Sequence, residues 1–291
     1  MPKATKLTRA ASLWCWCGLL LGAFASPTTA AAQNVFHVNV NLVNLGFVAR
    51  DSQGKLVPNL TADDIELFED AVPQKIHSFA KSTDLPLTLG LIVDASGSQD
   101  HFGKQHQKDV ELFLKEVLRP QDRVFVVCFG NHLRLVSNYS NSPEQVLENY
   151  ERYSKGKEKF PEIGPKEDRD LGTAFYDSIY YSVTEKLAQA ENVPIYAIRY
   201  TEVHHGKLNA RNKYGISVMD RIAKESGGLH INAEKTDPQT YFAQIAEELR
   251  TSYDIGYYPT NKAKDDSFRK IVIHPKIEGV SIRAKTGYFS R

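Results

Sequence analysis

The sequence predicts an α/β domain with a mostly parallel β-sheet, inserted into a β-sandwich that the two ends of the chain build together. Between residues 83 and 251, apolar segments of strand length alternate with segments of helical periodicity, which is typical of a sheet covered by helices on both faces. The flanking residues 33–82 and 252–291 contain only short strand-like segments. Because each flanking piece alone has little core, we expect one shared sandwich; two separate small β modules are the alternative.

The first 32 residues have the pattern of an export signal. Lys3, Lys6 and Arg9 precede an apolar stretch over residues 10–24, and small residues follow it. We expect cleavage after Ala32 and an exported protein, periplasmic or secreted. An uncleaved membrane anchor is the alternative, because the stretch is close to the length of a membrane span. No later segment is long enough to cross a bilayer, so we expect no stable membrane insertion after cleavage.

Charge and cysteine content narrow the function classes. The formal net charge is +1, which argues against nucleic acid or an acidic membrane surface as a partner. Cys15 and Cys17 lie in the predicted signal, so the mature chain has no pair of cysteines for an internal disulfide. Cys128 lies within an apolar strand-like run, and we predict a buried core residue rather than a reactive thiol.

The elements follow from the periodicity along the chain. N-terminal strands are expected within 35–50, 65–69 and 75–80; α/β strands at 87–93, 124–129, 133–139, 193–200 and 229–233; and C-terminal strands at 253–258, 269–274 and 280–288. Helices are expected at 104–118, from Pro143, from Thr173, around Met219 and from Pro238. Residues 155–170 are predicted to be a loop, either a specificity loop or a solvated connection.

The candidate site is the segment Asp94-Ala95-Ser96-Gly97-Ser98, directly after the strand at 87–93. That strand is a near-continuous apolar run, typical of a strand covered on both faces. Its carboxyl end is where open α/β sheets bind ligands. One carboxylate and two hydroxyls at this position are suitable oxygen donors for a hard divalent cation. His101 and His106 nearby are predicted to be solvated residues at the rim.

This segment, followed far downstream by Gly172-Thr173-Ala174-Phe175-Tyr176-Asp177, resembles the metal-ion-dependent adhesion site of von Willebrand factor A domains. Further segments resemble a related exported bacterial family that is abundant in acidobacteria. These segments are 85–91, 222–228, 249–259 and 287–289. The resemblance covers nearly all of residues 35–290 and implies a Rossmann-like sheet with a surface site for Mg²⁺, or for Mn²⁺ or Ca²⁺. Asp94, Ser96, Ser98 and Thr173 match the family's site residues.

The resemblance also implies how such a site works. Two serines and a threonine coordinate the metal directly, and the first aspartate and a second acidic residue act mainly through water. A partner protein supplies a carboxylate to the vacant position. Mostly neutral protein ligands suit this role, because they leave the metal ion electrophilic enough to prefer an anion.

The sequence departs from this family in one respect. Members usually have a strand ending in Ser-Asp-Gly, and then a helix, before the strand that corresponds to residues 193–200, and this strand-helix unit is missing here. We expect strand 193–200 to move beside the Asp94 strand, which makes a sheet of about five strands. Glu202 at its carboxyl end would then replace the lost aspartate. The alternative is a degenerate site without metal, in which Asp94 only caps backbone groups.

We therefore expect an exported, non-enzymatic binding module that recognises a carboxylate of a protein partner through a metal ion. An assembly scaffold with a metal-free site is the alternative, and a hydrolase that uses Ser96 ranks below both. The segment around Ser96 lacks the glycines of a nucleophile elbow. His204 and His205 are adjacent, so on a strand they point to opposite faces and do not form a zinc site. The C-terminal aromatic residues Tyr257, Tyr258, Tyr288 and Phe289 are predicted to belong to the sandwich core rather than to a binding surface.

Overall fold

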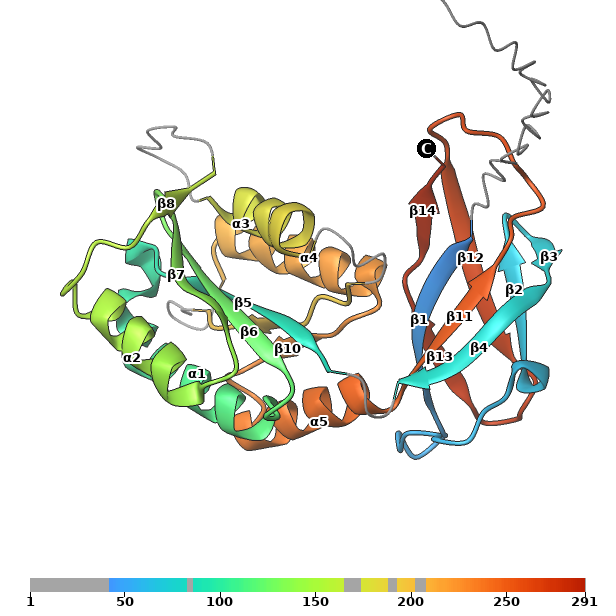
Figure 1. Ribbon diagram of the computed structural model, residues 1–291, viewed down its shortest axis with the longest axis horizontal. Coiled ribbons are helices and arrows are strands. Elements are labelled where there is room, and N and C mark those ends of the chain that lie inside the picture. Colours follow the sequence, from blue (N-terminus) through green and yellow to red (C-terminus); the bar gives the residue numbers. More distant parts are fainter. Residues whose placement is uncertain (1–41, 83–85, 165–173, 188–192, 202–207, 291) are drawn as a thin grey trace, which may run out of the picture. The chain divides into compact units, whose positions relative to one another are not determined.

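The structure is a computed structural model that describes residues 42–82, 86–164, 174–187, 193–201 and 208–290 (Figure 1). The predicted signal (1–32) and two of the predicted site residues, Thr173 and Glu202, lie outside the described residues. Among the residues described, no helix is both long and apolar enough to cross a membrane.

Strands from both ends of the chain form a β-sandwich. Its strands are β1 (Val43–Arg50), β2 (Ile65–Glu69), β3 (Val72–Gln74), β4 (Ile76–Ser82), β11 (Ser252–Tyr257), β12 (Phe268–Pro275), β13 (Ser281–Ala284) and β14 (Gly287–Phe289). One sheet has the order β13-β1-β11-β4 and the other β14-β12-β2-β3, so each sheet mixes N-terminal and C-terminal strands. The predicted composite sandwich is confirmed. Its core contains alternating residues of both ends, among them Leu45, Phe47, Tyr253, Ile255 and Ile271.

The inserted part is an α/β fold, as predicted. Its strands are β5 (Thr88–Asp94), β6 (Arg123–Phe129), β7 (Leu133–Ser140), β8 (Glu162–Ile163), β9 (Ala197–Arg199) and β10 (His230–Asn232). Its helices are α1 (Gly103–Glu116), α2 (Pro143–Ser154), α3 (Phe175–Tyr181), α4 (Ala210–Ser226) and α5 (Pro238–Arg250), with the short helical segments η2 (Gly97–Phe102) and η3 (Ser182–Lys186). Figure 1 shows α1, α2 and α5 on one face of the strands and α3 and α4 on the other.

The strand pairing differs in detail from the expected single sheet. β5 pairs with β6 in parallel, and β7 and β8 follow antiparallel, while β9 and β10 form a separate parallel pair. Within the described part of the chain, β9 does not pair with β5, so the five-stranded arrangement is not found. The physical reason is the short length of β9: only three residues after Pro194 are in strand conformation, and they pair with β10.

Local signals in the sequence position these elements. Ser142 accepts the Gln145 N–H at the start of α2, and Asp237 accepts the Thr240 N–H at the start of α5. Gly227 ends α4 in the left-handed conformation, with φ of 83°. Cys128 in β6 is completely buried, and burial raises the pKa of its thiol, which confirms its predicted place in the core.

Candidate metal-binding site

The candidate site lies where β5 ends and the chain turns into η2. Asp94 is the last residue of β5, and its Oδ1 accepts the backbone N–H of Ser96 at 2.9 Å. Ser96 precedes η2, and its carbonyl accepts the Gln99 N–H at 2.8 Å. Ser96 is buried and Ser98 is exposed, so one hydroxyl is held by its surroundings and the other faces solvent. The tight turn brings the two serine hydroxyls together and holds the Asp94 carboxylate against the backbone of Ser96.

The two serine hydroxyls have a separation that suits a common metal ion. Ser96 Oγ and Ser98 Oγ are 3.1 Å apart. Two neighbouring ligands of an octahedral Mg²⁺, each about 2.0–2.1 Å from the ion, are about 2.9–3.0 Å apart. The pair therefore fits adjacent coordination positions with little movement. Without an ion, the same distance is a hydrogen bond between the hydroxyls.

Two neighbouring segments meet this turn. Ala95 donates its N–H to the carbonyl of Phe129 at 2.7 Å, and Ala174 donates its N–H to the carbonyl of Gly130 at 2.8 Å. A Cβ at Gly130 would lie 3.3 Å from the Ala95 oxygen, so this glycine permits the close approach of the two turns. Ala174 directly follows Thr173 in the sequence. The residue next to the predicted threonine ligand and Ala95 are therefore hydrogen-bonded to two consecutive residues, Gly130 and Phe129.

A cluster that the sequence analysis missed connects α1 with the end of β9. The buried carboxylate of Asp109 accepts hydrogen bonds from the hydroxyls of Tyr200 and Tyr241, the latter at 3.3 Å. The centroids of the His106 and Tyr200 rings are 5.2 Å apart. No sequence signal finds this cluster beyond the position of Tyr200 at the end of a strand.

His106 links this cluster to the candidate site. Burial lowers the pKa of His106, and the nearby carboxylates of Asp109 and Asp94 offset part of that effect. His106 is half-buried rather than fully solvated as predicted, because its ring packs against the rings of Phe102 and Tyr200. His101 is exposed, as predicted. The end of β9 thus lies near α1 beside His106, and His106 is within electrostatic reach of Asp94.

The next residue after Tyr200 is also fixed. Thr201 is buried, its N–H donates to Glu234 Oε1 at 3.0 Å, and its Oγ1 accepts from Arg199 Nη1 at 2.8 Å. Glu234 follows β10 and places a carboxylate at this edge of the fold. The sequence analysis did not select it, although an acidic residue just after a strand is the signal that drew attention to Asp94.

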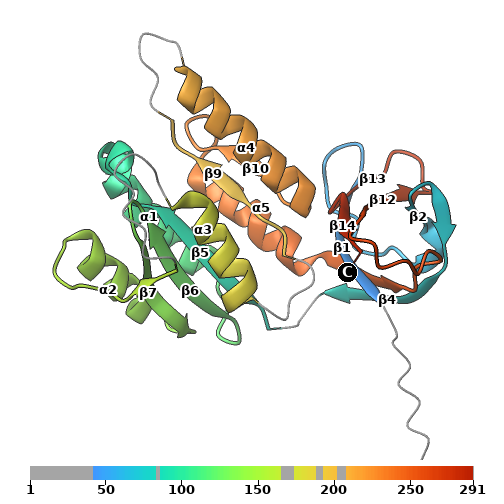
Figure 2. The same ribbon diagram turned by 90° about the horizontal axis from the view of Figure 1, so that it is seen from above.

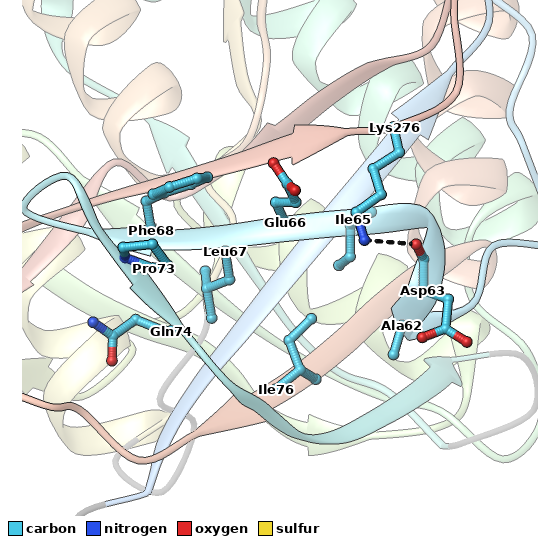
Figure 3. A pocket seen from close by; sticks show the side chains of 10 residues that line it. All are labelled: Ala62, Asp63, Ile65, Glu66, Leu67, Phe68, Pro73, Gln74, Ile76 and Lys276. Atoms are coloured by element: carbon cyan, nitrogen blue, oxygen red, sulfur yellow. Dashed lines mark hydrogen bonds between the residues drawn. The ribbon is translucent and has the colours of Figure 1, made fainter.

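Among the described residues, no three His, Cys, Asp or Glu side chains lie together as a metal-binding group. The oxygen donors beside Asp94 are the hydroxyls of Ser96 and Ser98. Figure 3 shows a pocket in the sandwich, lined by β2, β3 and the start of β4, where Lys276 Nζ donates to the carbonyl of Asp63 at 3.0 Å. This pocket contains no residue of the candidate metal site.

No family model matches the sequence, and no curated protein matches it. The structure is similar to a von Willebrand factor type A protein from Catenulispora acidiphila, with 12% identity over 88% of this chain and 74% of that chain and a TM-score of 0.37. It is also similar to the ArnB paralog VWA2 from Sulfolobus acidocaldarius, with 12% identity over 84% and 76% and a TM-score of 0.33.

A third similar structure is the vWF domain of the type V pili tip protein Mfa5 from Porphyromonas gingivalis. The identity is 12%, the TM-score is 0.27, and the match covers 40% of this chain and 38% of that one, so it spans less than half of either. Von Willebrand factor A domains are among the solved structures that this chain is similar to.

Proposed function

We propose that this protein is an exported binding module that recognises a partner protein through a divalent metal ion at the end of β5. Ser96 and Ser98 would hold the ion through their hydroxyls, Asp94 would act beside them, and Thr173 would complete the set. The observation that supports this most directly is the 3.1 Å separation of the two serine hydroxyls at a strand end.

The donor set also indicates the kind of group that the partner offers. Neutral hydroxyl ligands compensate little of the positive charge of a divalent ion, so the ion retains a strong preference for an anionic oxygen. An aspartate or glutamate side chain of a partner protein provides one. In the related family the second acidic group lies on the strand that is missing here. Glu202 or Glu234 would supply this group instead.

A second candidate function is an assembly scaffold whose site binds no metal. It is favoured by the hydrogen bond from the Ser96 N–H to Asp94 Oδ1, because a carboxylate that caps a turn already has a structural role. In that case the sandwich would mediate the interaction.

Thermal unfolding with Mg²⁺ or Mn²⁺, with and without a chelator, separates the two candidates. An ion that binds only the folded protein stabilises it by about 2.7 kcal/mol at a concentration a hundred times its dissociation constant. We expect this increase in the wild type and its loss in Ser96→Ala and Ser98→Ala. Ser217→Ala is the matched control, because Ser217 is an exposed serine on α4 that only caps the carbonyl of Tyr214.

The carboxylate preference is tested in the same titration. If an external carboxylate completes the coordination, acetate lowers the metal concentration needed for stabilisation and acetamide does not, because the two ligands bind with reciprocal coupling. Identical metal responses of the wild type and Ser96→Ala would contradict the metal site and favour the scaffold.

A further inference from the structure

We propose that β5 and β9 accept an extended apolar segment of a partner polypeptide, which adds as a β-strand between their two free edges. This inference goes beyond the proposed function and does not depend on a metal ion. It rests on the backbone pairing of the two strands, on the core that they share and on the exposure of their side chains.

The free edge of β5 follows from its pairing with β6. Arg123 donates its N–H to the Leu87 carbonyl, and Ala95 donates its N–H to the Phe129 carbonyl. Alternate residues of a parallel strand bond to opposite neighbours, so the odd-numbered residues of β5 bond to β6. The backbone groups of the even-numbered residues point to the other side. These residues are Thr88, Gly90, Ile92 and Asp94.

β9 has a free edge of the same kind. Ala197 donates its N–H to the Leu229 carbonyl, and the carbonyl of Arg199 accepts the Ala233 N–H, so these two residues bond to β10. The N–H and C=O of Ile198 therefore point away from β10. Within the described part of the chain, neither β5 nor β9 has a second hydrogen-bonded neighbour.

The two edges border a common core. Leu89 and Leu91 of β5 pack against the same buried cluster as Ile198 of β9, and this cluster includes residues of α1 and α5. Ile92 of β5 points to the other face, against the cluster that contains Phe175 of α3. Figure 2 shows β5 beside α3, and β9 and β10 beside α4 and α5. Apolar side chains thus lie beside the free edge of β5 on both of its faces, and beside that of β9 on the face that it shares with β5.

The exposure of β5 indicates that a neighbour is missing. In β6, every residue from Val124 to Phe129 is buried. In β5, which carries the four aliphatic residues Leu89, Leu91, Ile92 and Val93, only Val93 is buried and the others are partly or fully exposed. A central strand of a parallel sheet normally has both faces and both edges covered.

These features favour one kind of occupant. A strand between β5 and β9 is covered on both faces, so it needs successive Val, Ile or Leu residues rather than alternating polar ones. With β9 and β10 on the far side, the edge of β5 accepts one strand and not the complete sheet of a second copy. Residues 35–42 of this chain alternate apolar and polar side chains, which suits a half-buried strand better. We therefore assign the position to a partner's apolar segment of about five to seven residues, a usual strand length.

Hydrogen exchange of the full chain in the presence of a chelator tests this directly. The probe is the peptide Lys-Lys-Val-Ile-Val-Leu-Ile-Lys-Lys. In the protein alone, the amides of Gly90 and Ile92 should exchange at least tenfold faster than those of Leu89 and Leu91, which bond to β6. Saturating peptide should remove this difference. The same peptide with N-methylated isoleucines keeps its side chains, loses donors and should bind at least tenfold more weakly.

A matched pair of variants tests the edge itself. Thr88→Pro removes an N–H that points away from β6, at the first residue of the strand, where proline is tolerated. Thr88→Val keeps that N–H and loses the same side-chain bond from Arg123 Nε. We expect Thr88→Pro alone to weaken peptide binding, by about threefold to tenfold for one hydrogen bond.

Three results would overturn the proposal. Equal protection of all four amides in the protein alone, at every concentration, would mean that the chain covers its own edge. Protection that grows with protein concentration would mean that a second copy does. Unchanged exchange at saturating peptide would mean that the edge accepts no strand. Because a chelator is present throughout, none of these results bears on the metal site.

Discussion

Asp122 is a buried carboxylate whose partners come from three separate parts of the chain: the residue before β5, the connection after α1 and the end of α5. Its side chain is completely buried, accepts the N–H groups of Leu87 and Arg119 at 2.8 and 2.9 Å, and pairs with the guanidinium of Arg250 at the end of α5. Burial alone would raise the pKa of Asp122. The hydrogen bonds from Arg250, Leu87 and Arg119 outweigh burial and lower it below the ordinary value.

Asp122→Asn should destabilise the fold by about 3–5 kcal/mol at neutral pH, because it leaves the Arg250 charge buried without its partner. The sign of the pH dependence follows from the lowered pKa. The stabilisation by the carboxylate is present above the unfolded-state value of about 3.9 and is lost as the pH falls through the folded-state value. In urea unfolding, the difference in the free energy of unfolding between the wild type and Asp122→Asn should therefore become smaller as the pH is lowered from 7 to 3.

The exposed Glu148 provides the control for this experiment. Glu148→Gln, on the surface of α2, should leave the stability nearly unchanged at all these pH values. A constant difference between the wild type and Asp122→Asn across the whole pH range would contradict an ionised Asp122 in the folded protein.

At the scale of elements, Glu69 joins strands of the two sandwich sheets. Its buried carboxylate on β2 accepts hydrogen bonds from the hydroxyls of Tyr257 on β11 at 2.6 Å and Tyr288 on β14 at 2.9 Å. Tyr257→Phe removes one donor to a buried charge and should lower the free energy of unfolding by about 1.5–3 kcal/mol. Thermal or urea unfolding measures this loss.

Tyr258→Phe is the matched control, because the neighbouring tyrosine is exposed. Equal losses in both variants would contradict the role of the buried hydrogen bond. The prediction that the C-terminal aromatic residues belong to the sandwich core is confirmed for Tyr257, which is completely buried, and wrong for Tyr258 and Phe289, which are 42% and 58% exposed. Residue type alone does not distinguish the two faces of a short terminal strand.

The elements themselves could largely be predicted from the sequence, because their signals are local. The Asp94–Ser98 turn consists of consecutive residues, and the caps Ser142 and Gly227 act on their own helices. The pairing of Asp122 with Arg250 spans 128 positions and has no periodic signal. The contact of Tyr200 with Asp109 depends on where the short strand β9 lies, which the missing strand-helix unit made unpredictable.

At the scale of the whole molecule, the order of the sandwich strands makes the two ends of the chain depend on each other. Among the described residues, β1 pairs with β11 and β13, apart from one bridge between Arg50 and Leu56, and β2 pairs with β12 as well as with the short β3. β1, β2 and β4 therefore have most of their hydrogen-bonding partners about 170 or more residues later in the chain. Folding of the N-terminal strands has to wait for the C-terminal ones, which adds long-range loop closure to the folding barrier.

A chain that stops after Thr251 should accordingly contain an unfolded N-terminal piece, because residues 43–82 lose both neighbours of β1 and the long neighbour of β2. A three-residue strand cannot replace them. Limited proteolysis followed by mass spectrometry should find cleavage within residues 43–82 of the truncated protein and protection of the same residues in the full chain. Protection in both would show that the N-terminal strands form a β module of their own, the arrangement that the shared sheets argue against.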